Sequence, residues 1–152
     1  MASLRKQLQH IVNAYTEEGQ PWPATTRQIA SWAIRNDLWR PQPSALINQC
    51  ADQLAAAMRE EFITDPQGRP VRAKHVARVR KNGQQFALWA DIRTASRQHM
   101  EVALAQRRQA IVGDCRQLKL DADSYNENYN PGVPIQISLN FTWDVEELEG
   151  AA

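Results

Sequence analysis

The chain has 152 residues, with 18 Lys and Arg, 17 Asp and Glu, and a formal net charge of +1. Its apolar runs are too short for a transmembrane helix, and its first residues lack the apolar stretch of a signal peptide. Two isolated cysteines, Cys50 and Cys115, fit reduced core residues better than a disulfide and have no zinc-ligand spacing. These features predict a cytoplasmic protein with no membrane partner, metal or cofactor.

The small net charge hides a separation of charge along the chain. Residues 1–119 hold all 18 Lys and Arg against 10 Asp and Glu, a net charge of +8, whereas residues 120–152 hold seven acids and no base. Arg outnumbers Lys 14 to 4, and the planar guanidinium suits bidentate phosphate contacts. The acidic segment is open to two interpretations: a docking arm for a partner, or a polyanion that screens the basic part of its own chain.

Three helices are predicted in the first 60 residues. An amphipathic stripe predicts a helix over residues 3–17. A second helix, capped by Thr25 or Thr26, is expected to end near Trp39, before a Pro-containing break. A third is expected from about residue 44 to residue 60.

A strand at residues 62–64 and a type I turn at residues 65–68 are expected to lead into a basic hairpin. From Val71 to Arg80 small and apolar residues alternate with mainly basic ones, and the alternation resumes after the turn. Asn82-Gly83 supplies the two positive-φ residues of a tight turn. The predicted register places Lys81 opposite Gln84 and His75 opposite Ala90, with His75 a hydrogen-bonded core residue on the apolar face.

The other face of this hairpin is expected to be cationic. Residues 66–90 contain six Lys and Arg and no Asp or Glu, a composition that a phosphate backbone selects. The alternative is a solvated strand face that is charged to oppose aggregation. The predicted nucleic-acid contacts are Arg69, Arg72, Lys74, Arg78, Arg80, Lys81 and Trp89 on the hairpin, and Asn48, Gln49 and Gln53 on the third helix.

Helix, helix, helix, strand and basic hairpin is the element order of the winged-helix superfamily. More narrowly, the chain resembles the HARE-HTH type. The resemblance lies in Thr26-Arg27-Gln28-Ile29-Ala30, followed by Asn36-Asp37-Leu38-Trp39, a Pro-containing break and a third helix ending near Phe62. The resemblance covers about residues 3–92, with a longer wing here. It implies a DNA-binding or adaptor module of chromatin, transcription or restriction systems.

A long helix is predicted after this domain, to about residue 126. Leu104, Ile111 and Leu118 recur every seven residues, as in a heptad seam, although Gly113 interrupts the middle. This pattern predicts a homodimer or other homo-oligomer. The predicted self-association residues are Met100, Leu104, Ile111 and Leu118.

The C-terminal segment alternates apolar and polar residues from Ile135 to Val145, which predicts an amphipathic strand docked on this chain or another. Its QISLNF peptide also resembles the clamp-binding peptide of bacterial replication and repair proteins. That resemblance implies that Gln136 hydrogen-bonds the pocket edge of a sliding clamp while Leu139 and Phe141 fill its apolar cleft. Residues 135–143 are therefore a candidate contact for a protein partner.

The predicted fold class is α+β: a winged helix-turn-helix with a basic hairpin wing, a long C-terminal helix and a terminal amphipathic strand. The expected domains are a winged-helix domain at 1–92, a self-association helix at 93–128, and a hinge, strand and acidic tail at 129–152. No catalytic motif is present. The predicted function is non-enzymatic DNA binding, in transcription regulation or as a nucleoid- or replication-associated protein. The alternative is a protein-protein adaptor.

Overall fold

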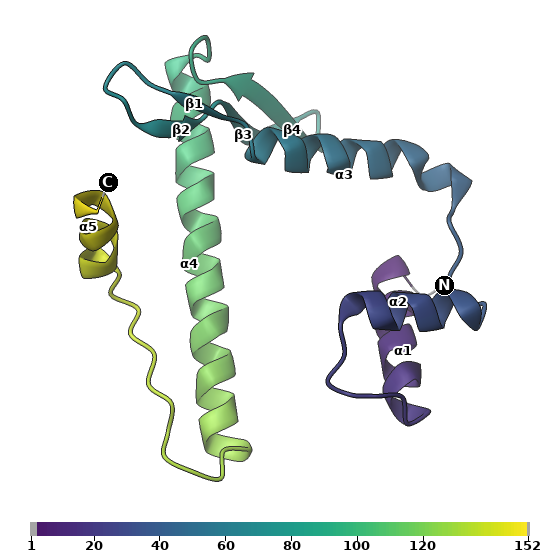
Figure 1. Cartoon of the computed structure of the whole chain (residues 1–152). Helices are drawn as coiled ribbons and strands as arrows, with labels where there is room; N and C mark the ends of the chain where they lie inside the picture. Colours follow the sequence, from purple (N-terminus) through teal and green to yellow (C-terminus); the bar gives the residue numbers. More distant parts are fainter. Residues whose placement is uncertain (1–2, 152) are drawn as a thin grey trace. The chain divides into compact units, whose positions relative to one another are not determined.

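The structure is a computed structural model that describes residues 3–151 (Figure 1). The described residues form five α-helices and two small antiparallel sheets, so the chain is α+β with one long helix. It divides into two compact units, residues 1–53 and residues 54–152. The domain boundaries expected at residues 92 and 128 stay predictions. None of the helices in the described part of the chain is long and apolar enough to cross a membrane.

The first unit begins with two capped helices, α1 (Leu4–Glu17) and α2 (Thr26–Arg35). Thr25 closes a capping box: its hydroxyl accepts from the Gln28 backbone N–H, and the Gln28 side chain accepts from the Thr25 backbone N–H. The α2 helix ends four residues before the expected Trp39. Asp37 adopts a left-handed φ of 61°, which an α-helix cannot continue.

The core of this unit lies between α1 and α2. Tyr15 and Trp32 are 2% and 5% exposed, and their rings meet edge to face with centroids 5.4 Å apart. The Tyr15 hydroxyl donates to the Pro21 carbonyl at 2.8 Å, which satisfies its polar end. Ala33 completes the buried cluster.

A short 3-10 turn, Pro43–Ala45, leads into α3 (Leu46–Arg59), and the boundary between the two units falls within this helix. None of its residues is buried. Two short strands follow, β1 (Phe62–Thr64) and β2 (Pro70–Arg72), which pair antiparallel.

The predicted turn at residues 65–68 is confirmed, because the Gly68 N–H donates to the Asp65 carbonyl at 2.9 Å. However, it joins β1 to β2 instead of leading into the basic hairpin. Val71 and Arg72 therefore belong to a separate small sheet, and the expected continuous strand from Val71 to Arg80 is wrong at its start. A bend at Ala73, whose N–H donates to the Glu61 carbonyl, separates the two sheets.

The basic hairpin itself consists of β3 (Lys74–Lys81) and β4 (Gln84–Asp91), and its register is the predicted one. His75 lies opposite Ala90 and Lys81 opposite Gln84. Asn82 and Gly83 have φ values of 52° and 75°, as a two-residue turn requires.

The long helix α4 (Arg97–Asn128) begins at Ser96, whose side chain caps it, and packs against β3. The fully buried residues of these elements are small: Ala73 in the bend before β3, Ala77 on β3 and Ala103 on α4. The predicted role of His75 is confirmed: it is buried, and its Nε2 donates to the Arg72 carbonyl at 2.9 Å.

The predicted terminal strand is wrong. Residues 133–141 form no sheet ladder, and Thr142–Gly150 forms a helix, α5. A strand must pair its backbone groups with a neighbouring strand edge. Here the side chain of Asn126 on α4 binds the backbone of Ile135 instead: its Nδ2 donates to the Ile135 carbonyl at 2.8 Å, and its Oδ1 accepts from the Ile135 N–H at 2.9 Å. The Glu-rich end of the segment favours a helix, and Asp144 lies in the first turn, where the helix dipole stabilises it.

Replacing Asn126 with alanine should release this segment from α4. The two hydrogen bonds to Ile135 are each worth about 0.5–1.5 kcal/mol, so the Ile135 amide should exchange roughly tenfold to a hundredfold faster. Hydrogen exchange followed by mass spectrometry measures this change. Asn128→Ala is the matched control, because the Asn128 side chain bonds only Ser124 within the helix. If both changes speed the exchange of the Ile135 amide equally, Asn126 does not hold this segment on α4.

Candidate functional site

The cationic face of the basic hairpin is largely as predicted. Lys74, Val76, Arg78 and Arg80 share the face opposite to the buried His75 and Ala77, and Trp89 lies across from Val76. The ribbon therefore presents basic side chains on one side and packs against α4 on the other.

Two of the predicted contacts are engaged by carboxylates. Arg69 donates to Asp65 at 2.8 Å, and Lys74 lies 3.0 Å from Asp91 and 3.2 Å from Glu61. Hydrogen bonds to Asp91 and then to Glu61 raise the pKa of Lys74. Asp91 stands one residue beyond the acid-free run, and the predicted register already implied its pairing with Lys74.

The other predicted basic contacts have no such partner. Arg72, Arg78, Arg80 and Lys81 form no ion pair with any carboxylate among the residues that the structure describes. By contrast, the arginines at 40, 93 and 97 are all paired. The unpaired positive charge of this unit thus includes the hairpin face and the strand that precedes it.

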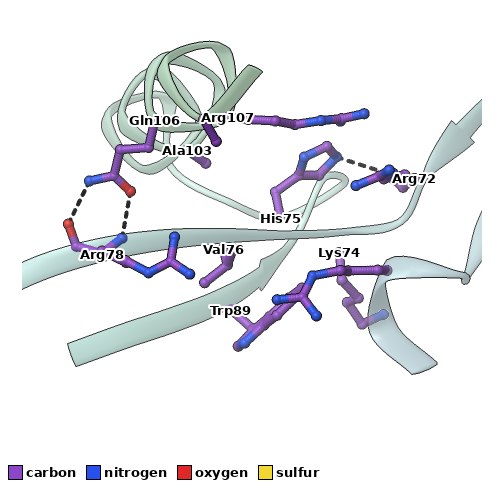
Figure 2. A pocket seen from close by; sticks show the side chains of 11 residues that line it. Arg72, Lys74, His75, Val76, Arg78, Trp89, Ala103, Gln106 and Arg107 are labelled. Atoms are coloured by element: carbon purple, nitrogen blue, oxygen red, sulfur yellow. Dashed lines mark hydrogen bonds between the residues drawn. The ribbon is translucent and has the colours of Figure 1, made fainter. Parts of the chain in front are cut away.

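A pocket of about 230 Å³ opens between the hairpin and α4 (Figure 2). Among the residues that the structure describes, β3 has a strand partner on one edge only. Gln106 of α4 binds Arg78 of β3: it accepts from the Arg78 N–H at 2.7 Å and donates to the Arg78 carbonyl at 2.8 Å. The lining residues are Arg59, Arg72, Lys74, His75, Val76, Arg78, Trp89, Ala103, Gln106, Arg107 and Ala110.

Arg59, at the end of α3, is a lining residue outside the set of predicted contacts. Its guanidinium lies 5.6 Å from the centroid of the Trp89 ring, a cation–π contact. One face of Trp89 is therefore covered by Arg59. This geometry gives Trp89 a role in positioning a cation, besides its predicted contact with a sugar or base.

Arg107 of α4 is the second residue that sequence reasoning missed. In Figure 2 its side chain reaches from α4 across His75 toward Arg72. Burial, and then the positive charge of Arg72, lower the pKa of Arg107, although an arginine stays charged at neutral pH. It lies four residues after Ala103 and so on the same face of α4, but no sequence signal marks that face as the one that packs on the hairpin.

The remaining predicted residues lie elsewhere. Asn48, Gln49 and Gln53 are exposed on α3 and belong to the first unit, whereas the hairpin belongs to the second. Leu104, Ile111 and Leu118 are exposed on α4, and Met100 is half-buried. Gln136, Leu139 and Phe141 are exposed in the C-terminal segment, where Gln136 and Leu139 help to line a groove with Lys119, Ala122, Asp123 and Asn126 of α4.

Among the described residues, no group of three or more His, Cys, Asp or Glu is placed to hold a metal ion. No family model, curated protein or solved structure matches the chain.

Proposed function

We propose that the protein is a non-enzymatic DNA-binding protein of winged-helix type that contacts backbone phosphates through the β3–β4 hairpin. The observation that carries this proposal is the set of cations at Arg72, Arg78, Arg80 and Lys81, which no carboxylate of the described chain neutralises. Clustered unpaired cations are unfavourable unless a polyanion approaches, and nucleic acid is the polyanion that a basic ribbon fits. Transcription regulation, nucleoid organisation and replication are the roles consistent with such binding.

The hairpin has the form of a wing. Its strands are eight residues each, it follows three helices in the chain, and its tip carries Arg80 and Lys81 beside the two-residue turn. Phosphate contacts position a protein on DNA without reading its sequence. The proposal therefore predicts binding that depends strongly on salt and weakly on sequence.

The test is the double substitution Arg78→Ala/Arg80→Ala. Loss of two phosphate contacts should flatten the slope of log K against log salt by about one to two units and weaken binding by roughly tenfold to a hundredfold at 0.1 M salt, on all duplexes alike. Fluorescence anisotropy over a salt titration measures both quantities.

The matched control is Arg40→Ala/Arg97→Ala, which removes the same charge from residues that already pair with Asp37 and Glu101. This variant should keep nearly the wild-type slope. If both double variants bind alike, the hairpin is not the contact surface.

A second candidate function is a protein-protein adaptor, which the exposed apolar C-terminal segment favours. Trp143 and Leu148 of α5 are about three-quarters exposed, at 75% and 76%, and acidic residues surround them. Such a surface suits a protein partner better than a polyanion. Binding of a sliding clamp through Gln136, Leu139 and Phe141 is one form of this function, and a salt slope near zero for DNA would favour it.

A further inference from the structure

We propose that the pocket between β3 and α4 is a site for one phosphate group, held between Arg72 and Arg107. The inference rests on the proposed function and deepens it: besides a charged strand face, the protein has a defined receptor for a single phosphate. The two arginines come from different elements, β2 and α4, and they line the same pocket (Figure 2).

The charges around Arg72 and Arg107 favour an anion. The two guanidinium groups are close enough for the charge of Arg72 to act on Arg107. Neither forms an ion pair with a carboxylate in the described chain. A bound phosphate would offset the mutual repulsion of the two guanidinium groups, and its oxygens match the fork of a guanidinium.

Three other cations line the pocket: Lys74 has carboxylate partners and Arg59 stacks on Trp89, whereas the Arg78 side chain forms no ion pair among the described residues. Lys74 also lines the pocket, but Asp91 and Glu61 neutralise it. Arg59 also lines the pocket, where its guanidinium lies over the Trp89 ring. Gln106 is occupied by the Arg78 backbone and so fixes α4 against β3. The charge available to a ligand therefore comes from Arg72 and Arg107, with Arg78 as a third unpaired cation at the rim.

The volume of the pocket suits a phosphate group with its hydration. Its roughly 230 Å³ is several times the share of about 30 Å³ that a water molecule has in the liquid. Arg59 already covers one face of Trp89, so this face offers no platform on which a base could stack. The chemistry that the pocket recognises is thus a phosphate, either within a DNA strand or at its 5′ end.

The test compares Arg107→Gln with Arg108→Gln, its neighbour on the same helix, which does not line the pocket and is exposed. Arg107→Gln should weaken DNA binding about tenfold at 0.1 M salt and flatten the salt slope by about one unit, because one phosphate contact is lost. Arg108→Gln should change the affinity by less than about twofold. The double variant Arg72→Gln/Arg107→Gln should lose less binding free energy than the sum of the losses in the two single variants, because both arginines bind the same phosphate.

Two further measurements make the outcome decisive. In the wild type, titration with inorganic phosphate should shift the Nε–H resonances of Arg72 and Arg107 saturably in NMR spectra, and Arg107→Gln should abolish the shift at Arg72. Duplexes with a 5′-phosphate or a 5′-hydroxyl distinguish the source: a preference for the 5′-phosphate that depends on Arg107 indicates a strand end, and equal binding that depends on Arg107 indicates an internal phosphate.

If Arg107→Gln behaves like Arg108→Gln while Arg78→Ala/Arg80→Ala weakens binding, the pocket proposal is overturned and the proposed function stands. If none of these variants changes binding, both fail.

Discussion

Replacing Ile111 with lysine is expected to convert the predicted homodimer into a folded monomer. Leu104, Ile111 and Leu118 recur every seven residues on α4 and stay exposed, with Ile111 53% exposed. The helix buries only Ala103 fully, against the hairpin, so these side chains lie on an open face that a second α4 can cover. A lysine in the middle of such an interface leaves buried charges unpaired in both copies, which costs several kcal/mol. Analytical ultracentrifugation over a concentration series measures the change.

The matched control for this experiment is Leu120→Lys. Leu120 is 48% exposed on the same helix, but it lies outside the seven-residue repeat. It should leave the dimer intact and the helix content unchanged. A wild-type protein that is already monomeric at high micromolar concentration contradicts the proposed dimer.

Replacing Trp32 with alanine should lower the free energy of unfolding of the first unit by about 3–5 kcal/mol. Trp32 is 5% exposed and packs edge to face against Tyr15 in the buried cluster between α1 and α2. Removing the indole leaves a cavity, and the Tyr15 ring loses its edge-to-face contact. Urea unfolding followed by circular dichroism at 222 nm measures the loss.

Trp39→Ala is the control, because Trp39 is 39% exposed in the same unit. It should cost about 1 kcal/mol or less. If the two substitutions destabilise the protein equally, the core between α1 and α2 is not what holds the unit together.

The local elements of this protein follow from short-range rules that can be read in the chain. Thr25 with Gln28 and Ser96 with His99 start helices because their side chains satisfy free N–H groups nearby. Asn82-Gly83 sets the turn of the hairpin, and a two-residue turn fixes every pair along both strands. Each of these depends on interactions within a few residues or on the alternation of a single hairpin.

The C-terminal segment shows where a periodic pattern is insufficient. Its alternation from Ile135 to Val145 is regular, but an alternating pattern describes side chains and supplies no partner for the backbone. Asn126 of α4, nine residues away, takes the backbone groups of Ile135, and the acidic residues near Glu147 favour the helix that follows. Which hydrogen-bond partner reaches the segment is decided in three dimensions.

The charge state of the site likewise required the tertiary arrangement. The absence of acids from residues 66–90 predicted six cations without carboxylate partners. In the structure, however, Lys74 forms ion pairs with Glu61, which precedes β1, and with Asp91 at the end of β4. Conversely, Arg59 and Arg107 join the pocket from α3 and α4, far from the hairpin in the sequence. Electrostatic energy depends on the distance between charges in space and on their burial. The composition of the chain therefore predicts the sign of the charge on a surface. Only the packing shows which of those charges are left without a partner and can bind a ligand.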